Sequence, residues 1–372
     1  MDKNTFWKVG AFFLIVIGIL AFTNRQLRVR KVAKNNIKKR VAKNIILLIG
    51  DGMGVSQISA HHYNENEKSY FEWFEHIGFQ KTHSLNSLVT DSAASGTSIL
   101  GGKKTNNTMV GVTPDSVVVM SLFEEGKDRG YKAGFVVTDT VVHATPAVTY
   151  AHQLLRGNFD FIAEDLTNSD FDFIVGGGAK YFSAGNSNAD RRRRTLKKKG
   201  YLVTEGRPSN KQLSNKEKIL WLTAFDNPNY AFEGRRYLPH ASTIATNFLN
   251  KENNEGFLLM IEGSQIDWAL HANDDRKFLE EMKDFDRTIV RMLDFAIKDK
   301  ETLVIVTGDH ECGGLAVNTG KKFGNLKLAY TTRKHTASMV PVFAFGPSAE
   351  EFTGIYDNTE IYFKMRKVLG WK

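Results

Sequence analysis

The stretch that decides the fold is Asn44-Ile45-Ile46-Leu47-Leu48-Ile49-Gly50-Asp51-Gly52-Met53-Gly54. A continuous run of Ile and Leu that ends in glycines is typical of a strand buried on both faces of a parallel sheet. In open α/β sheets, ligands bind at the carboxyl ends of such strands. Asp51 therefore stands where a functional residue is expected.

Four further apolar runs carry titratable residues next to one end. These are 134–137 before Asp139 and His143, 257–261 before Glu262, 303–306 before Asp309 and His310, and 340–345 after His335. The carboxyl ends of parallel strands meet at one edge of a sheet, so we predict that these side chains converge on one rim.

Amphipathic stretches alternate with these runs, and their apolar residues recur at helical spacing over 117–129, 162–168 and 276–299. Such alternation predicts an α/β fold with a largely parallel central sheet and helices on both faces. Residues 176–239 differ, because they hold few long apolar runs and two basic clusters. We predict a surface insertion there, with solvated charges.

The net charge of +9 is concentrated at the N-terminus of the 372-residue chain. Residues 1–43 alone carry +10, which leaves −1 for the remainder. A nearly neutral body argues against a general nucleic-acid surface, and we predict no nucleic-acid partner.

The N-terminal tail holds an apolar run over residues 6–22, interrupted by Lys8 and preceded by a short basic start. This pattern is typical of a signal peptide or a signal anchor. No convincing small-x-small cleavage site follows, so we favour an uncleaved anchor and basic spacer over 1–43, followed by one domain over 44–372. The protein is thus predicted to be exported, periplasmic or at the cell surface, and attached to the membrane by this segment.

Two motifs have the residue types of metal sites. Asp267 and His271 are four residues apart, so on a helix they would face one zinc ion or form a surface ion pair. Asp309 and His310 follow an apolar run, where both side chains can turn towards one metal or form a capped turn.

A third motif, Thr90-Asp91-Ser92-Ala93-Ala94-Ser95, has small side chains that let an anion approach the backbone. At the start of a helix, free N–H groups and the helix dipole favour negative charge. Ser92 is therefore a candidate nucleophile, activated by a metal, or a simple N-cap. Arg156 is suited to binding two phosphate oxygens, or is a surface residue.

Together these motifs resemble one family. Gly50 to Gly54, Thr90 to Ser95, Thr145-Pro146, Glu262 with Asp267 and His271, Asp309-His310 and His335-Thr336 occur in the order seen in alkaline phosphatases. The resemblance spans essentially all of residues 44–372. It looks closest to the compact bacterial branch from cold and marine organisms, which shares His143 and Trp268. It implies a three-layer α/β sandwich, a homodimer and metal-dependent hydrolysis of phosphate monoesters.

The resemblance also implies a role for each matching residue. Ser92 matches the nucleophile that becomes phosphorylated, Arg156 matches the phosphate clamp, and His143 and Trp268 lie near the substrate. The implied ligands of two zinc ions and one magnesium ion are Asp51, Asp309 and His310 for the first zinc, Asp267, His271 and His335 for the second, and Asp51, Thr145 and Glu262 for magnesium.

Three positions need separate expectations. The enterobacterial enzyme has Asp and Lys in the places of His143 and Trp268, so the chain has one carboxylate fewer near its magnesium site and one positive charge fewer for phosphate. Cys312, the lone cysteine, cannot form an intramolecular disulfide. It is either a soft metal ligand or a small buried residue, and we favour the latter.

Alternatives within the superfamily are a phosphodiesterase or a sulfatase. Sulfatases use a modified Cys or Ser in a Cys/Ser-x-Pro-x-Arg context, and the diesterases generally carry Thr as nucleophile and lack an equivalent of Arg156. Ser92-Ala93-Ala94 and Arg156 favour the monoesterase. A non-catalytic protein that binds metal or phosphate is a further alternative, but it would be expected to have lost at least one site residue.

Overall fold

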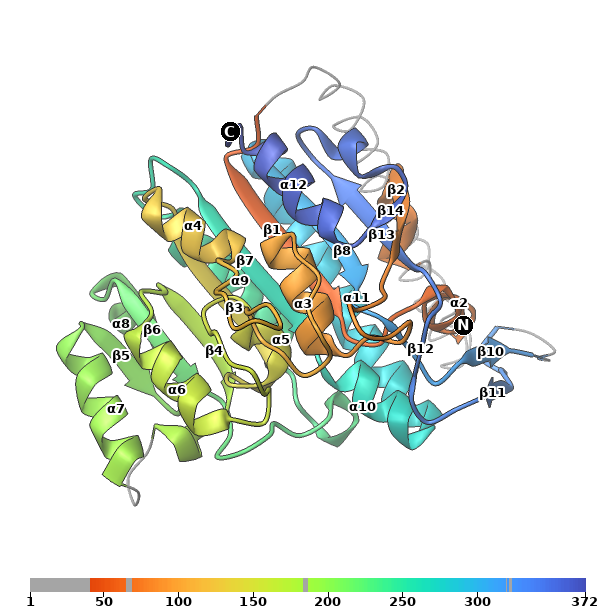
Figure 1. The fold of residues 1–372 in the computed structure, drawn as a ribbon, viewed down its shortest axis with the longest axis horizontal. Helices are drawn as coiled ribbons and strands as arrows, with labels where there is room; N and C mark the ends of the chain where they lie inside the picture. The colour runs from red at the N-terminus through yellow and green to blue at the C-terminus, as the bar shows by residue number, and fades with distance from the viewer. Residues whose placement is uncertain (1–40, 65–68, 183–186, 319, 321–322) are drawn as a thin grey trace, which may run out of the picture.

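The computed structural model describes residues 41–64, 69–182, 187–318, 320 and 323–372 (Figure 1). The predicted N-terminal anchor lies outside these ranges. Among the helices that they contain, none has the length and apolar character that a membrane span requires.

A ten-stranded sheet runs through the molecule (Figure 1). Its strands in spatial order are β14 (Gly354–Asp357), β2 (His76–Lys81), β13 (Val340–Phe345), β8 (Thr302–Gly308), β1 (Asn44–Gly50), β7 (Phe257–Gly263), β3 (Lys132–Thr140), β4 (Phe173–Gly177), β6 (Lys218–Leu222) and β5 (Tyr201–Thr204). Neighbouring strands are parallel, except where β13 pairs with β2 and β8. The predicted, largely parallel sheet is confirmed.

Strand β1 lies between β7 and β8, and all seven of its residues are buried. In the register of these strands, Gly50 lies beside Gly263 and Gly308. The residues that follow, including Asp51 and Asp309, therefore leave the sheet at the same rim.

Strand β13 runs against its neighbours, so it begins at the rim where the parallel strands end. The short strand β12 (His335–Thr336) precedes it and pairs with β9 (Glu311–Cys312), which follows β8. Because β13 is antiparallel to β8, His335, which precedes β13 in the chain, reaches the same rim as Asp309 and His310, which follow β8.

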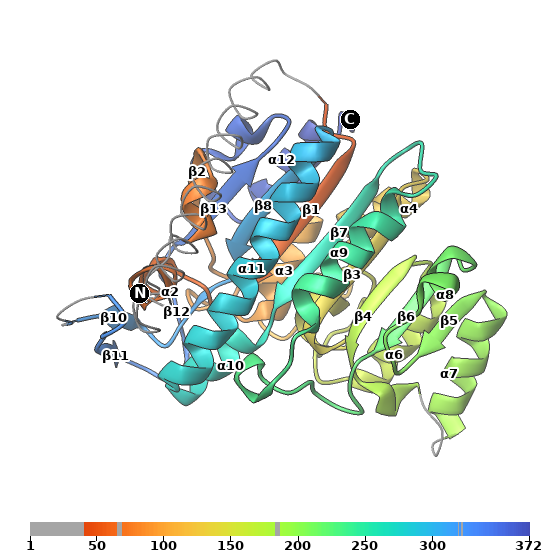
Figure 2. The ribbon, with the colours of Figure 1, turned by 180° about the vertical axis from the view of Figure 1, so that it is seen from behind.

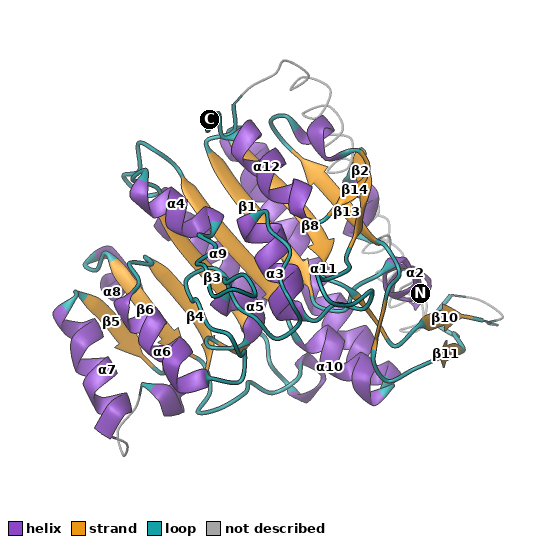
Figure 3. Cartoon of the chain, in the orientation of Figure 1, coloured by secondary structure: helices purple, strands orange, loops and turns teal. Residues whose placement is uncertain are grey.

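Helices cover both faces of the sheet, and each face has its own hydrophobic core (Figures 2 and 3). The helices of the first face are α3 (Ser92–Gly101), α4 (Leu122–Asp128), α5 (Ala144–Ala147), α6 (Phe159–Asn168), α7 (Ser187–Lys198) and α12 (Thr359–Val368). Those of the second are α2 (Val55–Asn64), α9 (Tyr237–Asn250), α10 (Gln265–Ala272) and α11 (Asp275–Asp299). The remaining elements are α8 (Asn210–Ser214), the antiparallel pair β10 (Leu315–Val317) and β11 (Leu328–Tyr330), and the 3₁₀ turns η1 (Tyr70–Trp73), η2 (Ala179–Tyr181), η3 (Ala231–Glu233) and η4 (Ala349–Phe352).

The amphipathic stretch 117–129 is helical only from Leu122 onwards. Ser121 starts the helix, because its hydroxyl accepts a hydrogen bond from the Glu124 N–H while the Glu124 carboxylate accepts one from the Ser121 N–H. Val118 instead forms an isolated bridge with Val112. Apolar spacing alone thus predicts the start of this helix too early.

Residues 176–239, which the sequence analysis predicts to be a surface insertion, contain α7, α8, β5 and β6. Strand β6 pairs with β4, and β5 forms the edge of the central sheet. The basic cluster lies on α7, where Arg191 and Arg192 form ion pairs with Glu164 of α6. This stretch therefore continues the layers of the main fold.

Candidate metal centre

Asp51, Asp309 and His310 meet at the rim, with one ligand atom each lying within 4.8 Å of one another. His310 Nε2 lies 3.4 Å from Asp51 Oδ1 and 3.2 Å from Asp309 Oδ2. All three side chains are buried, yet both Asp51 oxygens, Asp309 Oδ2 and His310 Nδ1 make no hydrogen bond. Buried charged groups without partners are costly, so this donor set fits a cation.

The protonation of these groups points the same way. Burial raises the pKa of Asp51, and repulsion by Asp309 and Asp267 raises it further. Burial also raises the pKa of Asp309 to about 6 and lowers the pKa of His310. A divalent cation would neutralise this repulsion and keep the carboxylates ionised.

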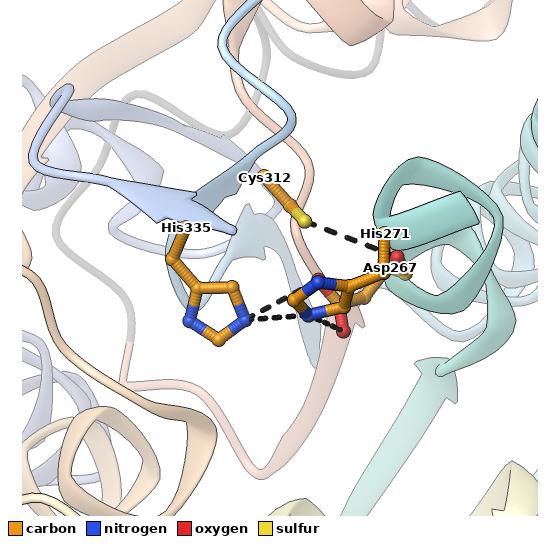
Figure 4. A group of neighbouring side chains, drawn as sticks. All are labelled: Asp267, His271, Cys312 and His335. Atoms are coloured by element: carbon orange, nitrogen blue, oxygen red, sulfur yellow. Dashed lines mark hydrogen bonds and ion pairs between the residues drawn. The ribbon is translucent and has the colours of Figure 1, made fainter. Parts of the chain in front are cut away.

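A second group consists of Asp267, His271, His335 and Cys312 (Figure 4). His271 Nε2 lies 3.2 Å from Asp267 Oδ2 and 3.1 Å from His335 Nε2. The other ring nitrogens face backbone carbonyls, since His271 Nδ1 lies 2.6 Å from Arg333 O and His335 Nδ1 lies 2.9 Å from Thr90 O. Each Nδ1–H can thus donate to a carbonyl, which leaves each Nε2 lone pair for a metal.

The helical spacing predicted for Asp267 and His271 is confirmed, because both residues lie on α10 and their side chains contact each other on the same face of the helix. Although burial raises the pKa of Asp267, its hydrogen bond from His271 and the nearby imidazoles lower it overall. The same contact raises the pKa of His271.

Gly52 allows the two groups to lie close together. Its φ of +74° is in the left-handed region, and a Cβ there would lie 2.9 Å from Cys312 Cβ and 3.0 Å from Asp267 Oδ1. Its N–H donates to Asp309 Oδ1 at 3.2 Å. Any larger residue would push the neighbouring ligands apart.

The side-chain oxygen atoms of Glu262 and Thr145 form a third candidate metal site beside the first group. Glu262 is in β7, where it pairs with Ile49 of β1, and Thr145 lies in α5. Both Glu262 carboxylate oxygens and the Thr145 hydroxyl are buried without a hydrogen-bond partner. Burial and the charge of Asp139 raise the pKa of Glu262. Carboxylate and hydroxyl oxygens fit a hard cation such as Mg²⁺.

Ser92 is the first residue of α3, whose N-cap is Asp91. The Asp91 carboxylate accepts a hydrogen bond from the Ala94 N–H at 3.0 Å, so Ser92 does not have to cap the helix itself. Ser92 Oγ lies 3.3 Å from His310 Nε2, at the edge of the first group. The hydroxyl therefore adjoins the atoms that would hold a metal.

Arg156 is held by two side chains. Its Nη1 donates to Asp91 Oδ2 at 3.0 Å, and its Nη2 donates to His143 Nε2 at 3.2 Å. His143 Nδ1 in turn lies 2.8 Å from Asp139 Oδ2, and the Trp268 ring meets His143 edge-on at 6.1 Å between centroids. The guanidinium is thus oriented before any substrate binds.

The sequence placed Asp139 at the rim and Asp91 in the Ser92 motif, but it did not reveal the partners of these two residues or of His152. The structure identifies Asp91 and Asp139 as the partners of Arg156 and His143. His152 bridges Glu124 and the carbonyl of Gly111, at 2.8 and 2.7 Å, and so fixes the loop before Arg156. The carboxylate partners of His152 and Arg156, which are Glu124 and Asp91, lie 28 and 65 positions away in the chain, so local sequence does not reveal them.

The sequence and the structure were compared with those of known proteins. The model of the alkaline phosphatase family matches residues 42–333. The chain belongs to the alkaline phosphatase family. Alkaline phosphatase 3 of Bacillus subtilis is 32% identical, over 88% of this chain and 89% of that protein. Alkaline phosphatase 4 of the same organism is 29% identical, over 98% of this chain and 97% of that protein.

Among solved structures, the alkaline phosphatase of the Antarctic bacterium TAB5 superimposes with a TM-score of 0.86 and 40% identity, over 90% of this chain and all of that one. Variants of the TAB5 enzyme in which a histidine is replaced by Asp or Glu have magnesium bound in their M3 site. The predicted resemblance is confirmed. The activity of this family is hydrolysis of phosphate monoesters, and the diesterase, sulfatase and non-catalytic alternatives are not favoured.

Proposed function

We propose that this metal-dependent alkaline phosphatase acts through a phosphoserine formed at Ser92. The observation that carries the proposal is the position of Ser92 Oγ, 3.3 Å from His310 Nε2 and beside buried ligand atoms that have no other partner. A hydroxyl next to a cation is more readily deprotonated and becomes a nucleophile.

The ligands of the two proposed zinc ions are Asp51, Asp309 and His310 for the first and Asp267, His271 and His335 for the second. Asp51, Thr145 and Glu262 would hold magnesium. Bound zinc would supply Lewis acidity that activates the serine and stabilises the leaving oxygen.

The protein's own groups perform the remaining steps. Arg156 binds the phosphate oxygens, because Asp91 and His143 fix its guanidinium and it has donors left over. Ser92 attacks phosphorus as the alcohol leaves, and water then hydrolyses the phosphoserine. The free N–H groups at the start of α3 favour the negative charge of the phosphate throughout.

Hydrolysis of chromogenic esters tests this function. A phosphate monoester, the matching diester and a sulfate ester are compared at neutral and alkaline pH, before and after the chelated enzyme is reloaded with zinc and magnesium. We expect a monoester preference, restored by zinc and higher at alkaline pH. A preference for diester or sulfate would overturn the substrate class.

Replacing Arg156 by alanine is expected to lower kcat/KM on the order of 10²-fold, since it removes charge-assisted hydrogen bonds to phosphate. Arg156→Lys should recover only part of the loss, because lysine lacks the planar fork. Steady-state kinetics checks this, with Arg129→Ala as the control, because the 40% exposed Arg129 contacts Glu125 and the Trp371 ring and none of the site residues. Equal effects of the two alanine variants would contradict the assignment.

Replacing His143 by aspartate is expected to strengthen Mg²⁺ binding. His143 contacts Asp139, which lies close enough to Glu262 to raise its pKa, so a carboxylate here adds an oxygen ligand near the proposed magnesium site. Magnesium binding by the Asp and Glu variants of the TAB5 enzyme supports this expectation. Titrating Mg²⁺ into the zinc-loaded variant measures it, with His143→Asn as the uncharged control. Equal Mg²⁺ affinity of the two variants would contradict it.

We further propose a homodimer that is exported and attached to the membrane through residues 1–43. Exposed apolar side chains support the dimer: Leu155, Val117 and Val118 are 54%, 51% and 55% exposed. The segments that carry them are neighbours, because residues 110 and 112 bridge to 153 and 118. Sedimentation of the full chain, and its fractionation with membranes, test these two assignments.

A further inference from the structure

Cys312 is the only cysteine of the chain, and its sulfur lies among the side chains of the proposed second zinc site. Its Sγ and one ligand atom each of Asp267, His271 and His335 all lie within 4.8 Å of one another (Figure 4). Sγ points towards Asp267 and lies 3.9 Å from its carbonyl oxygen. The small buried residue expected from the sequence is therefore also a potential ligand.

The backbone fixes the sulfur in this position. Cys312 pairs with His335 across β9 and β12, and its N–H donates to the Gly52 carbonyl at 3.1 Å. The Cβ atom of Cys312 lies directly against Gly52. Cys312 is thus held by the same two segments that carry ligands of both metal groups.

Burial shows from which side the sulfur approaches. Cys312 is fully buried, whereas the side chain of His271 is 40% exposed and that of His335 is 14% exposed. The sulfur therefore reaches the group from the protein interior. The exposed side of the two imidazoles leaves room for a substrate oxygen, which would bind as a fifth ligand if four protein groups hold the metal.

The remaining donors are available to a metal. Asp267 Oδ1 is buried and makes no hydrogen bond, although His335 Nε2 lies 3.5 Å away. With the two Nε2 atoms and the sulfur, the donor set is one oxygen, two nitrogens and one sulfur. Imidazole and thiolate are preferred by Zn²⁺, and thiolate strengthens the preference for soft cations.

We propose that Cys312 is a fourth protein ligand of this metal site. Binding of the cation forms a metal–sulfur bond and releases the thiol proton to solvent. The sulfur makes the site selective for zinc and cadmium over hard cations. The inference rests on the proposed zinc site of Asp267, His271 and His335.

Cobalt substitution tests the proposal without any assay of activity. The full chain and the variants Cys312→Ser and Cys312→Ala are stripped of metal and titrated with Co²⁺. We expect a thiolate-to-cobalt charge-transfer band in the near ultraviolet for the wild type and for neither variant. The visible ligand-field bands should persist in all three proteins. Because the chain has no second cysteine, the near-ultraviolet band reports on Cys312 alone.

Competition with a chromophoric chelator gives a second readout. Cys312→Ser should weaken Cd²⁺ binding by about tenfold or more, and Zn²⁺ binding by less. Ligand-field bands without the near-ultraviolet band in the wild type would overturn the role of Cys312 and leave the metal site standing. Failure of all three proteins to bind Co²⁺ would overturn both the inference and the proposed site.

Discussion

Replacing Ser92 by alanine is expected to lower the rate of phosphate monoester hydrolysis by a factor on the order of 10³ or more. The change removes the Oγ that lies 3.3 Å from His310 Nε2 but none of the proposed metal ligands. Helix α3 should keep its start, because the cap is Asp91. Steady-state kinetics measures the loss, and zinc content should stay that of the wild type.

A labelled phosphate ester makes the same variant a test of the intermediate. Acid quenching should trap label on the wild-type chain and none on Ser92→Ala. The matched control is Ser98→Ala, since Ser98 is buried in the same helix and its hydroxyl only donates to the Ala94 carbonyl. We expect near-normal activity and labelling there. Wild-type turnover by Ser92→Ala would show that another group is the nucleophile.

Removing the metals is expected to abolish activity and to make the stability of the protein fall as the pH rises. Without a cation, the folded state raises the pKa values of Asp51, Glu262 and Asp309, that of Asp309 to about 6. The folded chain then holds more protons than the unfolded chain from about pH 4, where unfolded carboxyl groups titrate, up to about pH 6 for Asp309 and to higher pH for Asp51 and Glu262. Raising the pH through this range therefore favours unfolding.

Two imidazoles contribute with opposite signs. The raised pKa of His271 adds to the loss of stability with rising pH, whereas the lowered pKa of His310 works against it. Three carboxyl groups and His271 lower the stability as the pH rises, and His310 alone raises it. We therefore expect the stability of the metal-free protein to fall with rising pH. Asp267 has a lowered pKa, and its contribution changes only at more acidic pH.

Thermal unfolding of the chelated protein across this pH range measures the effect. The melting temperature should fall with pH, and added zinc should restore it most at the upper end. Asp51→Asn should flatten the slope in the chelated protein, whereas Asp128→Asn, at an exposed position, should leave it unchanged. A melting temperature that rises with pH after chelation would contradict the proposed clustering of carboxylates.

The parts of the fold that sequence predicted share one physical cause. A parallel strand that is buried on both faces has an unbroken apolar run of residues. The runs 44–49 and 303–306 therefore predict both the strands and the edge of the sheet where they end. The pair Asp267 and His271 was predictable for a similar reason, because helical spacing fixes which side chains share a face.

The remaining features depend on contacts between distant residues. Nothing local reveals that 340–345 runs antiparallel, or that Asp91 would orient Arg156 from 65 positions away. Strands as short as β5 carry too few residues for an alternation signal. The position of Cys312 likewise follows from its pairing with His335, which only the folded sheet creates.

The antiparallel strand β13 has a consequence for biosynthesis. A ribosome that has completed β9 has already synthesised Asp51, Asp309 and His310, but His335 and β13 follow later. Strand β2 must also wait, because its partners in the sheet are β13 and β14. A chain that ends before β12 therefore contains every residue of the first metal group but lacks His335 of the second. The catalyst becomes complete only after nearly the whole polypeptide has been translated, at the cost of slow, long-range strand pairing.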